Sequence, residues 1–353
     1  MYRAFLVDKG LIKKDQHFSQ GCTFCHKGNS KAWDRRVAHK GLVSRPSKDL
    51  STCGDCHEDV TKNFRNAMHF TSNGQRNGVI GRFSAEEIVV FDKNVFESSC
   101  RSCHASCGDC HVSSPPIAGV KTGLIKGHRF IKRDEGRTCA LCHGGRVYPE
   151  FTGEYGGSAD IHYQKGMLCV DCHKKKELHG DGVLYKSMKD IQDRPKCINC
   201  HKIGEKDSEN AGTAHAIHRD RLSCYACHAG SPYKNCYGCH LGKGAESKPG
   251  FFIGISPRDK KTVTTLRLIP TVRDTFRQAG IEMRYYDSLP NYWDTASHNI
   301  RKRTDRTRSC DVCHKERRDY LTTDKLIKNG SKANMDVIIK EKNKNIRRSY
   351  EVP

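Results

Sequence analysis

Long apolar stretches are missing from this chain of 353 residues, of which only 36% are apolar and 8% aromatic. No segment approaches the roughly eighteen consecutive apolar residues of a membrane-crossing helix, so we expect no membrane span. The first ten residues also lack the apolar run and small-residue cleavage site of an export signal, which predicts a processed form or an incomplete reading frame. With so little apolar material, a conventional aliphatic core would be thin.

Cysteine, by contrast, is abundant, and none of the twenty cysteines stands outside one pattern. The pattern is Cys-x-x-Cys-His, and it occurs ten times. Its cysteines are Cys22 and Cys25, Cys53 and Cys56, Cys100 and Cys103, Cys107 and Cys110, Cys139 and Cys142, Cys169 and Cys172, Cys197 and Cys200, Cys224 and Cys227, Cys236 and Cys239, and Cys310 and Cys313. The histidines that close the ten copies are His26, His57, His104, His111, His143, His173, His201, His228, His240 and His314.

This pattern is the attachment signature of covalently bound c-type haem. The two thiols add to the haem vinyl groups as thioethers, and the adjacent imidazole becomes the proximal ligand of the iron. Zinc sites built from cysteine pairs and a disulfide framework are the alternatives. Neither explains why a histidine follows the second cysteine in all ten copies. The sequence therefore predicts ten c-type haems, with their iron, as cofactors.

A six-coordinate haem iron needs a distal ligand as well as a proximal one. Nine histidines lie outside the motifs and are predicted to be distal ligands: His17, His39, His69, His128, His162, His179, His215, His218 and His298. They are one short of a complete set. The tenth ligand could be a methionine such as Met68 or Met167, a lysine or terminal amine, or a residue of a neighbouring subunit. The tenth position could also be open to a small molecule.

The formal charge of +22 would ordinarily suggest a nucleic-acid or anionic-membrane partner. Haem propionates weaken that interpretation, because they bring the assembled protein to about +12 when oxidised and about +2 when reduced. No nucleic-acid-reading motif is present in the sequence, so we expect no nucleic-acid partner.

The expected fold is mostly irregular, with short α-helices and few short strands wrapped around a stacked chain of ten haems. A short helix is expected at each motif, because Cys-x-x-Cys places the thiols about one turn apart on one side. Strands are predicted at Glu87–Phe91, Phe251–Ile255 and Thr262–Ile269 from their β-formers. The basic tail after His314 is predicted to be solvated.

Motif spacing predicts three regions: residues 1–240 with nine haems, a haem-free strand-bearing subregion at 241–309, and residues 310–353 with the last motif and the basic tail. The two motifs at Cys100–His104 and Cys107–His111 are separated only by Ala105 and Ser106. Their haems are therefore predicted to be neighbours.

The density of motifs between residues 22 and 314 resembles the multihaem c-type cytochromes of respiratory electron-transfer chains, particularly decahaem and octahaem proteins of metal-reducing and sulfur- or nitrogen-cycling microbes. This resemblance implies a chain of stacked and perpendicular haems along which electrons hop. It also implies an extracytoplasmic location, periplasmic or extracellular, because c-type haem is attached outside the cytoplasm. Some members of the group polymerise into extracellular filaments, which implies possible self-association here.

Two functions remain open from the sequence. The leading hypothesis is an electron conductor without substrate chemistry, which exchanges electrons with redox partner proteins or an extracellular acceptor and has no catalytic residues. The alternative is a multihaem reductase or oxidase of a small nitrogen or sulfur compound, acting at a haem that lacks a distal histidine. No Cys-x-x-Cys-Lys motif is present, which removes one catalytic version of such enzymes.

Overall fold

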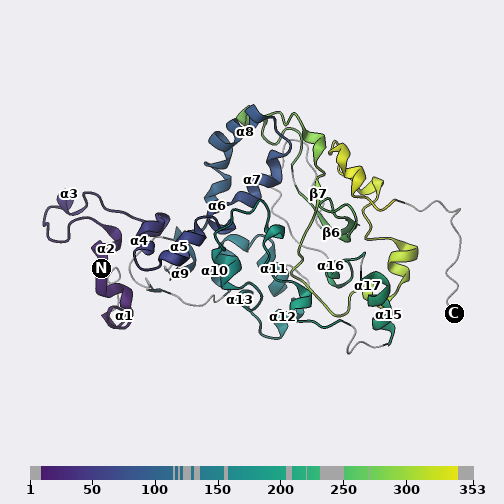
Figure 1. Cartoon of the computed structure of the whole chain (residues 1–353), viewed down its shortest axis with the longest axis horizontal. Helices are drawn as coiled ribbons and strands as arrows, with labels where there is room; N and C mark the ends of the chain where they lie inside the picture. The colour runs from purple at the N-terminus through teal and green to yellow at the C-terminus, as the bar shows by residue number, and fades with distance from the viewer. Residues whose placement is uncertain are drawn as a thin grey trace. The chain divides into compact units, whose positions relative to one another are not determined.

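The computed structural model describes residues 9–113, 116–117, 120–121, 129–130, 136–154, 158–203, 209–219, 221–230, 250–269 and 271–340. The chain forms two units, one from residues 1–78, 95–142 and 168–195 and the other from residues 79–94, 143–167 and 196–353. In both units short helices are joined by irregular segments (Figure 1). The three consecutive regions inferred from motif spacing, and the wrapping of the chain around haems, stay predictions.

The first unit consists mainly of short helices. They are α1 (Lys9–Lys14), α2 (Cys22–His26), α3 (Arg35–Ala38), α4 (Leu50–Gly54), α5 (Glu58–Phe64), α6 (Met68–Thr71), α9 (Cys107–His111), α13 (Cys169–Cys172) and α14 (Lys175–His179), with α7 (Asn73–Ile80) and α10 (Arg137–His143) ending in residues of the second unit. Its 3-10 helices are Gln16–Gln20, Pro46–Lys48, Cys100–Cys103 and Met188–Asp190. Two-residue strands pair as β1 (Val112–Ser113) with β4 (Arg129–Phe130) and β2 (Pro116–Ile117) with β3 (Val120–Lys121).

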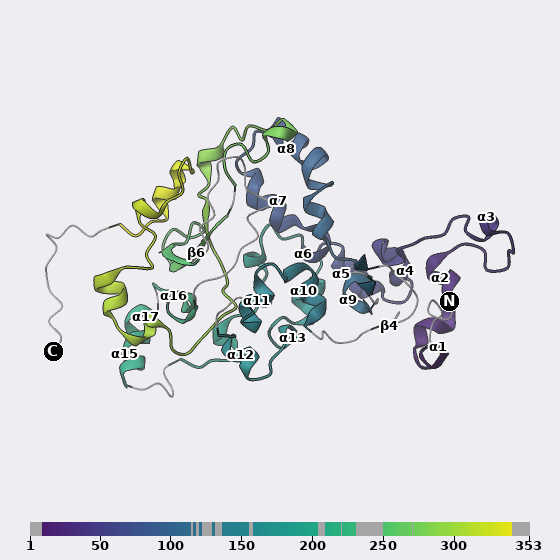
Figure 2. The same cartoon turned by 180° about the vertical axis from the view of Figure 1, so that it is seen from behind.

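A small core holds the middle of this unit together. Leu50, Phe64 and Ala67 are buried against one another, with Phe70 packed on them. The core joins α4 to the α5–α6 segment, and Figure 2 shows α4, α5 and α9 grouped together. The side chain of Asp49 caps α4 by accepting a hydrogen bond from Ser51 N at 3.0 Å, which fixes the start of the helix that carries Cys53.

The second unit combines short helices with a sheet. Its helical segments are α8 (Ala85–Phe91), α11 (Val147–Thr152), α12 (Ile161–Gln164), α15 (Glu209–His218), α16 (Cys224–His228), α17 (Asp305–Arg308), the 3-10 helices Cys197–Asn199, Arg277–Ala279, Tyr286–Ser288, Thr323–Lys325 and Lys332–Asp336, and the π-helical turns Asp92–Phe96 and Val312–Glu316, the first of which ends in residues of the first unit. Its antiparallel sheet has the order β5 (Phe252–Ile255), β6 (Val263–Leu268) and β7 (Tyr292–Asp294).

The sheet confirms the strands predicted at Phe251–Ile255 and Thr262–Ile269. Its core continues into the C-terminal segment, and its buried members are Leu266, Leu268, Val272, Tyr292, Leu321, Ile327, Val337 and Ile338. The prediction of a solvated tail was therefore wrong for Leu321, Ile327, Val337 and Ile338, because these tail residues are buried in the core of the sheet. Residues 341–353 lie outside the described residues.

The strand predicted at Glu87–Phe91 was wrong, because this segment is helix α8. The run of β-branched residues is preceded by a capping box, in which Ser84 Oγ accepts from Glu87 N and Ser84 N donates to the Glu87 carboxylate at 2.8 Å. These bonds satisfy two amide groups at the helix start and outweigh the weak preference of Ile88–Val90 for a strand.

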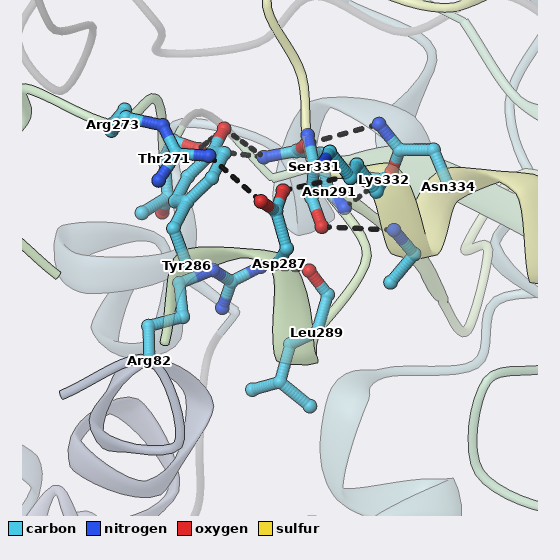
Figure 3. Close-up of polar contacts among 11 residues, drawn as sticks. Arg82, Thr271, Arg273, Tyr286, Asp287, Leu289, Asn291, Ser331, Lys332 and Asn334 are labelled. Carbon is cyan, nitrogen blue, oxygen red and sulfur yellow. Dashed lines mark hydrogen bonds and ion pairs between the residues drawn. The ribbon is translucent and has the colours of Figure 1, made fainter. Parts of the chain in front are cut away.

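Buried polar side chains fix the loops beside the sheet (Figure 3). Asn291 N donates to Asn334 Oδ1 at 2.7 Å, and Asn334 Nδ2 donates back to Asn291 Oδ1 at 3.1 Å. Asn291 Nδ2 also donates to the carbonyl of Thr271 at 2.6 Å. The ring of Tyr286 lies between two cations, with the guanidinium of Arg273 4.4 Å and that of Arg82 5.9 Å from its centroid. Burial lowers the pKa of Arg82 to about 10, which still leaves it charged at neutral pH.

We expect Asn334→Ala to lower the free energy of unfolding by about 1–3 kcal/mol, because it leaves the buried amide of Asn291 without its acceptor. Urea denaturation followed by circular dichroism measures the change. The matched control is Met335→Ala on the same 3-10 turn, where the side chain is 45% exposed and the expected change is within about 0.5 kcal/mol. Equal losses in both variants would contradict a special role for the asparagine pair.

Candidate metal centres

A helical turn accompanies each of the nine Cys-x-x-Cys-His copies whose backbone the structure describes, as predicted. The same closing bond recurs, in which the histidine amide donates to the carbonyl of the first cysteine four residues earlier. It measures 2.9 Å in the copies ending at His57, His173, His201 and His314. This turn brings the two cysteine side chains and the histidine to neighbouring positions on one side of the helix.

None of the seventeen cysteines whose side chains the structure describes is in a disulfide bond. Some thiols of different motifs meet. Cys53 lies close to Cys107, and Cys197 lies close to Cys224. Both contacts join the first cysteine of one motif to the first cysteine of another. Attachment points that are distant in sequence are therefore neighbours within each unit.

Histidine rings meet in pairs, and each pair has the same composition. The five pairs, with their centroid separations, are His17–His57 at 6.2 Å, His111–His179 at 5.9 Å, His162–His201 at 5.9 Å, His215–His228 at 6.1 Å and His218–His314 at 6.2 Å. Every pair contains one motif histidine and one histidine predicted to be distal. Each pair also lies within a single unit.

These separations fit two imidazoles on opposite sides of one metal ion. A metal–imidazole bond is about 2 Å long, so the two ligating nitrogens are about 4 Å apart. Each ring centroid lies about 1 Å behind its nitrogen, which gives about 6 Å between centroids. The residues present therefore fit an iron held between a proximal and a distal histidine.

Hydrogen bonds orient many of these rings for ligation. In seven histidines, Nδ1 lies within hydrogen-bonding distance of an oxygen that can only accept. Three of these oxygens belong to carboxylates: Asp15 at 2.8 Å from His17, Asp160 at 2.8 Å from His162, and Glu177 at 2.9 Å from His173. The other four are backbone carbonyls: Val43 at 2.8 Å from His26, Arg101 at 2.6 Å from His104, Ala214 at 2.8 Å from His218, and Arg301 at 3.0 Å from His228. Such an acceptor requires the proton on Nδ1. The lone pair of Nε2 is then directed away from it, as in metal-ligating histidines generally.

His69 and His173 lie close enough for the charge of one to affect the pKa of the other. Burial lowers the pKa of His69, and His173 lowers it further against the opposite effect of Glu177. At His173 burial acts to lower the pKa, but the hydrogen bond and charge of Glu177 outweigh it and the pKa is raised. Burial also lowers the pKa of His179, with His111 and His69 among the contributors. Neutral imidazoles at His69 and His179 are the form that binds a metal.

The helix that carries His179 reaches its place because of a glycine. Gly180 follows α14 with φ of 79°, and a Cβ there would lie 3.1 Å from Ala67 Cβ and 3.2 Å from the carbonyl of Asn63. Glycine therefore allows the end of α14 to approach the α5–α6 segment closely. The same approach brings His179 next to the ring of Phe64, with centroids 6.1 Å apart.

Asp15, Asp160 and Glu177 are functional candidates that motif reasoning missed. Asp15 and Asp160 each lie two residues before a distal histidine and cap the turn that follows, and Glu177 lies four residues after a proximal one. The signal was present in the sequence as Asp15-Gln16-His17-Phe18 and Asp160-Ile161-His162-Tyr163.

The other predicted ligands do not lie in one of the five histidine ring pairs. His39 is exposed, and no histidine ring lies against it among residues 9–113 or the other described ranges. His298 is held at its amide by Glu150 Oε2 at 3.0 Å. His104 has the ring of Phe70 at 5.9 Å. His128, Cys236, Cys239 and His240 lie outside the described residues, as does the side chain of Cys103.

No protein-family model, curated protein or solved structure matches the chain. In the part of the chain that the structure describes, no helix is long and apolar enough to cross a membrane. The same part contains no group of three or more histidine, cysteine, aspartate or glutamate side chains arranged to hold a metal ion. Described histidine rings instead lie against one another in pairs.

Proposed function

We propose that the chain is a multihaem c-type cytochrome that conducts electrons through ten haems. The observation that carries this proposal is the pairing of one motif histidine with one other histidine in all five ring pairs. Bound haem supplies an iron that changes between the ferric and ferrous states by one electron. A zinc or disulfide role for the cysteines would give no reason for this second set of histidines.

The pairs assign distal ligands to particular motifs. His17 serves the motif that ends at His57, His179 that at His111, and His162 that at His201. His215 and His218 serve those at His228 and His314. His69 is assigned to His173 from their electrostatic contact.

His298 is assigned to His143, because its own amide and the nearby carbonyl of Ala296 are both hydrogen-bonded to the segment that follows the motif of His143. His298 N donates to Glu150, and the guanidinium of Arg146 donates to the carbonyl of Ala296 at 3.4 Å. Arg146, the residue before α11, also forms an ion pair at 2.9 Å with Glu150 on α11. The ion pair thus holds the histidine loop against the segment after His143.

The protein's other contribution is to hold the histidine rings in pairs. An iron held by both histidines of a pair would have no position left for a substrate, which favours electron transfer over catalysis at those centres. We further propose an extracytoplasmic location, exchange with redox partner proteins or an extracellular acceptor, and possible self-association. These proposals follow from covalent haem attachment and from the resemblance to multihaem cytochromes.

Mass spectrometry and low-temperature EPR of the purified protein test the proposal. We expect a mass increase of ten covalent haems and ferric signals that are almost entirely low-spin, because most irons have two imidazole ligands. A mass without covalent haem would contradict the proposal. One high-spin haem that responds to nitrite, hydroxylamine or sulfite would instead support the reductase alternative.

We expect His218→Ala to convert one haem, that of the Cys310–His314 motif, from low-spin to high-spin while haem content is unchanged. The reason is loss of the imidazole that faces His314. EPR spin quantitation gives the number of converted haems, and the control is Ile217→Ala, an exposed neighbour on the same helix. The double variant with His215→Ala should convert two haems. Conversion of none in the single variant would refute the assignment.

A further inference from the structure

Two of the assigned centres use the same local device, an aspartate two residues before the distal histidine. Asp15 Oδ1 accepts from both His17 N at 3.1 Å and His17 Nδ1 at 2.8 Å. Asp160 Oδ1 accepts from both His162 N and His162 Nδ1 at 2.8 Å. We call each arrangement an Asp-x-His turn. One lies in each unit, and each faces a motif histidine, His57 or His201.

The carboxylate changes what the imidazole donates to a metal. An anionic acceptor on Nδ1–H draws the proton toward itself and makes Nε2 a more basic ligand. A more basic ligand stabilises ferric iron over ferrous iron and lowers the reduction potential, since hydrogen bonding around the ligands tunes that potential. A backbone carbonyl, which is neutral, does this less.

Each Asp-x-His centre has a close neighbour that is built differently. The Cys53 thiol of the first meets Cys107, whose motif is served by His179. The Cys197 thiol of the second meets Cys224, whose motif ends at His228. The two sulfurs in each contact belong to two different motifs. The two haem centres that we propose for those motifs are therefore adjacent.

In each neighbouring centre, one ligand histidine has an Nδ1 that does not face a carboxylate. His228 Nδ1 lies 3.0 Å from the backbone carbonyl of Arg301. The Nδ1 of His179 is buried and has no hydrogen-bond acceptor among the described residues. Each unit therefore places a histidine anchored by a carboxylate in one centre, and a histidine without that anchor, His179 or His228, in the neighbouring centre.

We infer that each unit contains a pair of adjacent haems at unequal potentials, in which the Asp-x-His turn defines the low-potential member. This inference rests on the proposed function. An electron that enters a pair resides mainly on the neighbour, the haem of Cys107–His111 or of Cys224–His228. Asp15 and Asp160 act through His17 and His162, and are positioning residues that also set the potential.

The test is an EPR-monitored redox titration of the holoprotein carrying Asp15→Asn. Asparagine retains an oxygen that accepts the same hydrogen bonds and removes only the negative charge. We expect one haem to titrate at a higher potential and its low-spin signal to change its g values, with the other haems little changed. Asp160→Asn should do the same to a different haem, and the double variant should move two.

The control is Asp49→Asn, which removes a carboxylate from the cap of the helix carrying Cys53 but leaves His17 untouched. A shift in Asp15→Asn no larger than in Asp49→Asn would overturn the inference. Haem mass and spin state are measured first in every variant. Loss of covalent haem in the unsubstituted protein would refute the proposed function, whereas ten bound haems with no selective shift would refute only the unequal pairs.

Discussion

The arrangement of the rest of this protein depends on the approach of two imidazole rings to about 6 Å across a space that fits one iron. Five such approaches occur among the described residues, and several connect segments distant in sequence, for example His17 to His57 and His218 to His314. With little aliphatic material to bury, each approach is maintained locally, by a short helix, a capped turn or a hydrogen bond at Nδ1. This accounts for helices as short as four residues, such as α12, that could not persist alone.

The two parts of the second unit are stabilised by different means. Around β5–β7 the chain forms an ordinary buried core, with leucine and valine side chains and the Asn291–Asn334 exchange of hydrogen bonds. Around the histidine pairs the stabilising groups are backbone carbonyls, carboxylates and the Arg146–Glu150 ion pair. The sheet thus has a core of its own, and the loop 295–301 extends from it to the segments that carry His162 and His228.

The helical turn at each described motif could be predicted, because the motif is contiguous and its turn is local, whereas haem attachment and ligation by its residues stay predictions. The strands at 252–255 and 263–268 were also predictable from β-formers. The ring pairs were not, since nothing in the sequence links His162 to His201 rather than to another motif. The tail was mispredicted because the prediction followed its many basic residues rather than the apolar Val337 and Ile338. Helix α8 was mispredicted because the capping box of Ser84 and Glu87 outweighs the strand preference of its β-branched residues. Asp15 and Asp160 are visible in the sequence, but they become functional candidates only if His17 and His162 are ligands, as we propose.

Helix α15 carries His215 and His218 three residues apart, and each faces a different motif histidine. The partner of His215 follows soon after it in the chain, whereas the partner of His218 lies near the C-terminal end. Under the proposed function, α15 would therefore supply one ligand to a nearly local centre and the next ligand to a centre that needs the far end of the chain. A chain truncated before Cys310 would keep the first ring pair but leave His218 without the ring of His314.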